Sequence, residues 1–164
     1  MESFDKSSLK IESRAKIGII VPPTNTVNEI EWNLMVPSGV SVHSTRMPLH
    51  SSLQNKGAKQ KLFDDVRVAT CYLSQANLNV IAYGCTAGSM ILPLSELSDF
   101  MQNIANTPCI TTAASIVNAL RAIVKTKVAL STPYHKQLNV DDVVFLESVG
   151  MKVIHNEGLG IGSG

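Results

Sequence analysis

Short apolar segments alternate with longer stretches of helical spacing along this chain. Six segments have the pattern of strands: residues 16–21, 40–47, 79–85, 109–111, 127–131 and 152–155. Most are runs of apolar and β-branched residues, whereas residues 40–47 alternate apolar with polar positions. Both patterns are typical of strands, because successive side chains of a strand point to opposite faces of a sheet.

Helical spacing fills the stretches between these strands. Residues 59–75 place Leu62, Val66, Ala69 and Leu73 on one stripe of a helix. Further helices are predicted from a cap at residues 24–26 to about residue 35, and over residues 95–105, 113–124 and 136–149. Strands that alternate with helices predict the α/β class, with a parallel sheet flanked by helices.

Composition narrows the class of protein further. An apolar fraction of 45% with 16% charged residues indicates a globular chain with one ordinary core. The net charge of +1 gives no long-range field, so we expect neither nucleic acid nor a membrane surface as partner. No run approaches the roughly 20 apolar residues of a membrane span. Residues 1–14 alternate charges with serine and predict a flexible tail rather than a secretory signal, so we expect a soluble, cytoplasmic protein.

Small and polar residues follow three of the predicted strands, in the segments VPPTN, YGCTA and STPYH. In open α/β sheets, ligands bind in the crevice at the carboxyl ends of the strands. Cys85 stands there between a strand and a helix, where the positive end of the helix dipole favours a thiolate. The alternative is a buried thiol that only fills the end of the strand.

Asn25 and Tyr134 are uncharged candidates in the other two loops. Asn25 can hold a carboxylate or enolate oxygen, although spacing alone favours a role in helix capping. Tyr134 can donate to a substrate carboxylate or pack against its loop. Cys71 and Cys109 are expected to pack in the core and to carry no chemistry.

Cofactor signals are weak in this sequence. The four histidines lack the spacing of metal ligands, so we expect no metal site. The terminal GLGIGSG resembles a dinucleotide loop, but no helix follows it in the sequence. Pro22 and Pro23 occupy the turn where a nucleotide-binding flavodoxin-like module would carry its phosphate loop, which disfavours that alternative.

Four segments in order, IGIIVPPTNTVNEIE, VSVHSTRMPLH, VIAYGCTAGSM and LSTPYHKQLN, resemble motifs of the Asp/Glu racemase superfamily, and among its branches the maleate cis-trans isomerases. The resemblance covers nearly the whole chain after the tail. Two segments, IGIIVPP and ALRAIVKTKVALSTPY, are also similar to arylmalonate decarboxylases. In those decarboxylases the position that matches Cys85 is not cysteine, which favours the isomerase branch.

The resemblance implies two similar flavodoxin-like α/β lobes that face each other across a cleft, without metal or organic cofactor. Residues 15–112 would form the first lobe and residues 113–164 an incomplete second lobe. Cys85 matches the cysteine that adds to the double bond of maleate. Asn25 and Tyr134 match residues that hold the substrate carboxylates, and Thr86 would line the same pocket.

The chain departs from the family pattern in one respect, because it carries only the first of two catalytic cysteines. We therefore expect a C-terminally truncated isomerase of a small dicarboxylic acid with impaired activity. Two alternatives stay open: an inactive remnant that binds a carboxylate or pairs with a subunit, and an arylmalonate-type decarboxylase or amino-acid racemase. The expected partner is a small carboxylic acid, and homo-oligomerisation is a further possibility.

Overall fold

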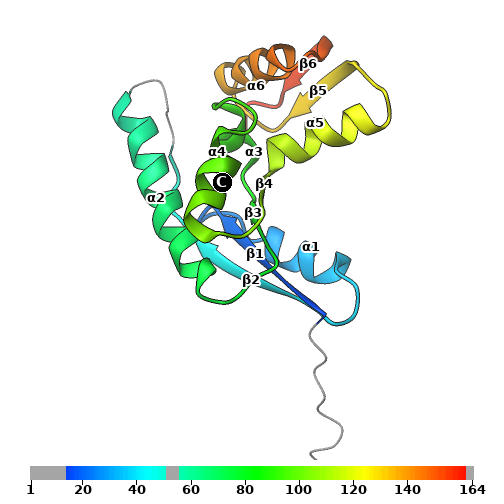
Figure 1. Ribbon diagram of the computed structural model, residues 1–164. Helices are drawn as coiled ribbons and strands as arrows, with labels where there is room; N and C mark the ends of the chain where they lie inside the picture. The colour runs from blue at the N-terminus through cyan, green and yellow to red at the C-terminus, as the bar shows by residue number, and fades with distance from the viewer. Residues whose placement is uncertain (1–13, 51–55, 162–164) are drawn as a thin grey trace, which may run out of the picture.

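The computed structural model describes residues 14–50 and 56–161, which contain two parallel sheets (Figure 1). The first sheet has the strand order β2-β1-β3-β4. Its strands are β1 (Ala15–Val21), β2 (Val40–Arg46), β3 (Val80–Tyr83) and β4 (Cys109–Thr111). The second sheet pairs β5 (Lys127–Thr132) with β6 (Lys152–Gly158). These parallel sheets and their helices confirm the predicted α/β class.

Helices connect the strands at the predicted places. They are α1 (Asn28–Met35), α2 (Lys56–Ser74), α3 (Thr86–Met90), α4 (Glu96–Ala105), α5 (Thr112–Ala122) and α6 (Lys136–Ser148). The short helix α3 is the one whose bounds were not predicted from the sequence, which indicated only a change from strand to helix after Cys85. It has five residues, too few for a helical spacing to show in the sequence.

The first sheet is covered on its two faces by different helices (Figure 1). Ile20, Ile81 and Tyr83 pack with the apolar stripe of α2 and with α4. The alternate residues of β1 and β3 form a second cluster on the opposite face, where Trp32 of α1 packs against it. This is the period-two alternation of strands buried on both faces.

A separate core joins the second sheet to α5 and α6. Val117 of α5 and Leu146 of α6 are buried there, and Val128 and Val153 of the second sheet pack against them. Met90, the last residue of α3, belongs to the same core. The short helix α3 therefore starts at the end of a strand in the first sheet and ends in the core of the second (Figure 1).

The structure corrects the expectation for Cys71. This side chain is exposed, because the buried stripe of α2 runs through Ala69 and Leu73. A helix turns about 200° over two residues, which places Cys71 on the opposite side from both. Cys109 is half-buried and packs against the first core, as expected.

Two other expectations are only partly covered by the structure. The predicted tail, residues 1–14, lies outside the described residues except for Arg14. The boundary between lobes at residues 112 and 113 stays a prediction. Within the described part of the chain, every helix is too short or too polar to cross a membrane.

We expect truncation of Val66 to alanine to lower the free energy of unfolding by about 2 kcal/mol, because it removes buried methyl groups and leaves a cavity. Val68 lies on the same helix and is a matched control, since 51% of it is exposed against 0% for Val66. Val68→Ala should cost well under half as much. Urea unfolding followed by circular dichroism measures both, and equal losses would contradict the assignment of the buried face of α2.

Candidate functional site

The turn from β3 to α3 positions Cys85 at the carboxyl end of the first sheet. Cys85 is the N-cap residue of α3, with an extended backbone, and its sulfur accepts a hydrogen bond from the backbone N–H of Gly88 at 3.4 Å. The residue is half-buried. A cysteine thus takes the capping place that serine, threonine, asparagine or aspartate usually fills.

Tyr83 and Gly88 enclose the sulfur of Cys85. Tyr83 is two residues before Cys85, is 3% exposed, and its hydroxyl group hydrogen-bonds the sulfur. A Cβ atom on Gly88 would lie 2.5 Å from the Tyr83 hydroxyl and 3.1 Å from the Cys85 sulfur. Only a glycine allows this backbone to approach so closely.

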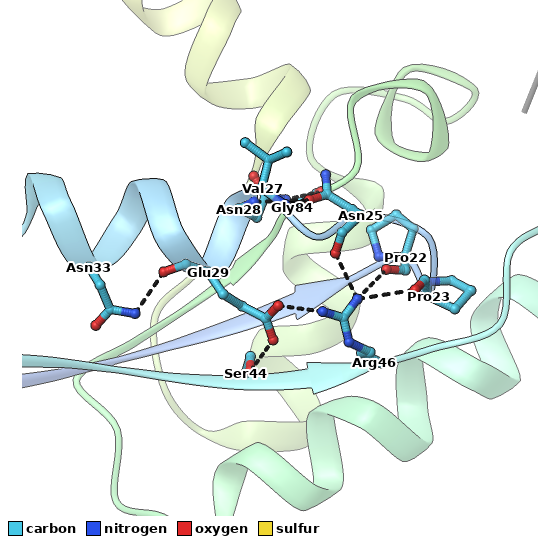
Figure 2. Close-up of polar contacts among 10 residues, drawn as sticks. All are labelled: Pro22, Pro23, Asn25, Val27, Asn28, Glu29, Asn33, Ser44, Arg46 and Gly84. Carbon is cyan, nitrogen blue, oxygen red and sulfur yellow. Dashed lines mark hydrogen bonds and ion pairs between the residues drawn. The ribbon is translucent and has the colours of Figure 1, made fainter. Parts of the chain in front are cut away.

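The loop after β1 lies beside this turn and contains Asn25 (Figure 2). The Asn25 Oδ1 atom accepts from the backbone N–H groups of Val27 and Asn28, at 3.0 and 2.9 Å. Asn25 therefore holds the turn that leads into α1, whose N-cap residue is Val27, and this is close to the capping role that spacing alone favoured. The side chain of Asn28 donates to the carbonyl of Gly84 at 2.9 Å and links this loop to the residue before Cys85.

Arg46, at the end of β2, holds the same loop in place (Figure 2). Its guanidinium donates to the carbonyl oxygens of Pro22, Pro23 and Asn25, at 3.0, 3.2 and 2.7 Å. It also forms an ion pair with Glu29 of α1. The guanidinium is thus occupied by the loop and by a carboxylate.

A cleft of about 370 Å³ lies between α3, α5, α6 and β5. Its wall is mainly apolar, and five polar residues line it: Thr86, Ser131, Thr132, Tyr134 and Asp142. Thr86 and Tyr134 meet directly, since the Thr86 hydroxyl and the Ala87 backbone N–H hydrogen-bond the phenol oxygen of Tyr134. The structure therefore brings Thr86 and Tyr134 together at this cleft, whereas neither Asn25 nor Cys85 is among the residues that line it.

Burial has the largest effect on the pKa of Cys85, the candidate nucleophile. Burial raises the pKa of Cys85, while the hydrogen bonds from Gly88 and Tyr83 lower it and the nearby Asp142 raises it further. The net direction is upward, opposite to the expectation from the helix dipole. The reason is that desolvation of the buried thiol is the largest effect, and the hydrogen-bond donors around the start of the five-residue helix α3 do not outweigh it.

Asp142 lines the cleft together with Tyr134 and is a titratable group that sequence reasoning missed. Burial, and then the neighbouring Asp141, raise the pKa of Asp142 from its ordinary 3.8 to about 6. Its signal in the sequence is its spacing, because Asn139, Asp142 and Leu146 share the buried face of α6. Tyr83 has a similar signal, since residues two apart on a strand share a face and Tyr83 precedes Cys85 by two.

Metal-ligating side chains do not gather in this region. Among residues 14–50 and 56–161, no group of three or more His, Cys, Asp or Glu side chains is arranged to hold a metal ion.

The Cys109 thiol donates to the carbonyl of Thr107, and burial raises the pKa of Cys109 to about 11. No cysteine is among the described residues that line the cleft, and of the three cysteines Cys85 alone is adjacent in sequence to a lining residue, Thr86.

Comparison with known proteins relates this arrangement to one family. Residues 17–163 match the family described as arylmalonate decarboxylase. Maleate isomerase of Geobacillus stearothermophilus is 27% identical over 89% of this chain and 64% of its own length. Maleate isomerase of Pseudomonas putida is 29% identical, over 84% of this chain and 60% of its own length. The structure of a maleate isomerase variant from Pseudomonas putida S16 with maleate superposes with a TM-score of 0.71 at 26% identity, covering 90% of this chain and 64% of that chain. This chain thus spans about 60–64% of the length of these proteins.

We expect Tyr83→Phe to slow alkylation of Cys85 by iodoacetamide about tenfold or more near neutral pH. The variant keeps the buried ring but removes the hydroxyl group that stabilises the thiolate, and a hydrogen bond to a charged acceptor is worth about 1.5–3 kcal/mol. Peptide mass spectrometry resolves the rate at Cys85. Tyr72→Phe is the control, because 66% of that residue is exposed on α2. Equal rates in wild type and Tyr83→Phe would show that the hydroxyl group does not act on the sulfur.

Asp142→Asn should stabilise the fold at neutral pH by about 2 kcal/mol. Because the folded-state pKa of Asp142 is raised from 3.8 to about 6, the folded chain binds its proton more tightly than the unfolded chain does. The free energy of unfolding of the wild-type chain therefore falls as pH rises from about 4 to about 6. An asparagine side chain has no carboxyl group to ionise, so the free energy of unfolding of Asp142→Asn does not show this fall. Urea unfolding at pH values below and above this window measures the difference. A variant that is equally destabilised at both would contradict the assigned shift.

Proposed function

Because this chain belongs to the arylmalonate decarboxylase family, we propose that it acts on a small dicarboxylic acid of the maleate type, with the Cys85 sulfur as nucleophile. The observation that carries the proposal is the position of that sulfur. It lies half-buried at a strand end, hydrogen-bonded to Gly88 and Tyr83, next to a cleft lined by Thr86 and Tyr134. The maleate isomerases to which the chain is similar support maleate as the first substrate to test.

The proposed reaction needs no oxidant and no net proton transfer. After the thiol proton passes to water, the sulfur adds to one alkene carbon of maleate, and the electron pair of the double bond moves onto the adjoining carboxylate as an enediolate. The former double bond is now a single bond and can rotate. When the electron pair returns, the carbon–sulfur bond breaks, the thiolate leaves and fumarate forms.

Neutral hydrogen-bond donors would orient the two carboxylates in this scheme. Thr86 and Tyr134 already meet in the cleft, so a ligand carboxylate could share their hydroxyl donors. Asn25 uses its Oδ1 atom to accept from the backbone N–H groups of Val27 and Asn28, which leaves the two N–H donors of its amide group for a carboxylate. Binding by these three residues is part of the proposal.

Turnover by the 164-residue chain is proposed to be low. The resemblance assigns a second cysteine to the second lobe, but Cys71 is exposed on α2 and Cys109 packs against the first core. A carboxylate-binding or subunit-pairing module is therefore the second candidate. Exposed apolar side chains on α1 favour pairing: Ile30, Leu34 and Met35. Decarboxylation of an arylmalonate-type acid is a further alternative, because the matched family is described by that activity.

Incubation with maleate is expected to add the mass of one maleate to Cys85, because Cys85 precedes Thr86 of the cleft wall and interacts with Tyr134 and Asp142, which also line the cleft. Intact-mass and peptide mass spectrometry locate the adduct, and fumarate in the same samples reports turnover. Cys85→Ser should abolish the adduct, whereas Cys71→Ser, at an exposed thiol outside the cleft, should retain it. An adduct that persists in Cys85→Ser would remove Cys85 from the mechanism, and fumarate formation at rates typical of enzymes would overturn the proposed impairment.

A further inference from the structure

Asp142 lies on the buried face of α6 and contributes to the wall of the cleft. It is 2% exposed, and within the described residues its Oδ1 atom has no hydrogen-bond partner. A buried carboxyl oxygen without a hydrogen-bond partner lowers the stability of the fold. A buried polar group of this kind therefore calls for an explanation, such as a functional role or a bound partner. A ligand in the cleft can supply the missing hydrogen bond.

The groups that act on Asp142 electrostatically are acidic. Asp141, which precedes it on α6, raises the pKa of Asp142, and Asp142 in turn raises the pKa of Cys85 at the start of α3 and of Tyr134 in the loop before α6. The charged side chains on the elements packed against α6 are exposed: Arg121, Lys127, Lys152, His155 and Glu157. No lysine, arginine or histidine is among the described residues that line the cleft. The charge of an ionised Asp142 is therefore unbalanced inside this cleft.

The protonation of Asp142 consequently changes what the cleft can bind. An ionised carboxyl group only accepts hydrogen bonds and repels a second carboxylate, whereas a protonated one donates. The raised pKa of Asp142, about 6, places the change between these two states just below neutral pH. An anionic ligand that enters the cleft favours the protonated form further, with the proton taken from water.

We propose that Asp142 is a specificity-determining residue, which donates a hydrogen bond to a ligand carboxylate when protonated and repels anionic ligands from Cys85 when ionised. This rests on the proposed function, because it requires a carboxylate ligand beside the Cys85 sulfur. The proposal adds Asp142 to that site. It also states that an anionic ligand binds in the cleft when Asp142 is protonated.

Two alkylating reagents of similar size separate charge selectivity from thiol reactivity. Iodoacetate is an anion and iodoacetamide is neutral, and both keep their charge between about pH 5 and about pH 8. The ratio of their rates at Cys85, measured by peptide mass spectrometry, cancels the fraction of thiolate. We expect this ratio to fall about tenfold across that range in the wild-type chain, with a midpoint near the pKa of Asp142.

Asp142→Asn should keep the ratio at its low-pH value throughout. Asp141→Asn is the matched control, because Asp141 is a neighbour on the same helix that hydrogen-bonds Gln137 and does not line the cleft. This control should retain the fall, with its midpoint moved to a lower pH because Asp141 contributes to the raised pKa of Asp142. A flat ratio in the wild-type chain, or an unchanged fall in Asp142→Asn, would overturn the role of Asp142 alone. A Cys85 that reacts with neither reagent would overturn the proposed function and this inference together.

Discussion

The attachment of α3 to two separate cores is the constraint on which this site depends. Its upstream end is fixed because β3 lies between β1 and β4 in the first sheet. Its downstream end is fixed because Met90 is buried in the second core and the Ser89 hydroxyl group accepts from the backbone N–H of Ala113 at 3.0 Å. Only a short turn and a five-residue helix connect these anchors, so the close packing of both cores determines where Cys85 lies.

Two opposing electrostatic effects act on the sulfur held in this way. The N–H of Gly88 and the hydroxyl group of Tyr83 favour the thiolate, whereas burial favours the thiol and prevails. Tyr83 is suited to its role as a donor, because burial raises its own pKa and keeps its hydroxyl group protonated. The fold therefore fixes the position of the Cys85 sulfur but does not favour its ionised form.

Sequence patterns were sufficient for the elements but not for all of the site. Strands and long helices were predictable, since each has enough residues to show its period, and the same strand ends pointed to Cys85 and Tyr134. The exposure of Cys71 was missed because a general preference of free cysteine for the core was given more weight than the phase of the α2 stripe. Asp142 could not be assigned to the cleft, since that contact depends on how α6 packs against α3 and β5.

The distribution of positive charge explains why a proton matters at this site. Arg46 lies at the same sheet edge, but its guanidinium binds three loop carbonyls and the carboxylate of Glu29. The hydroxyl groups of Thr86 and Tyr134 already bind each other. Among the described residues of the cleft, the Asp142 carboxyl oxygen is the side-chain atom that is buried without a partner, and it becomes a donor only when protonated. Under the proposed function, a ligand carboxylate in this cleft would therefore meet a hydrogen-bond donor on Asp142 only when Asp142 is protonated, and no fixed cation among the described lining residues would balance its charge.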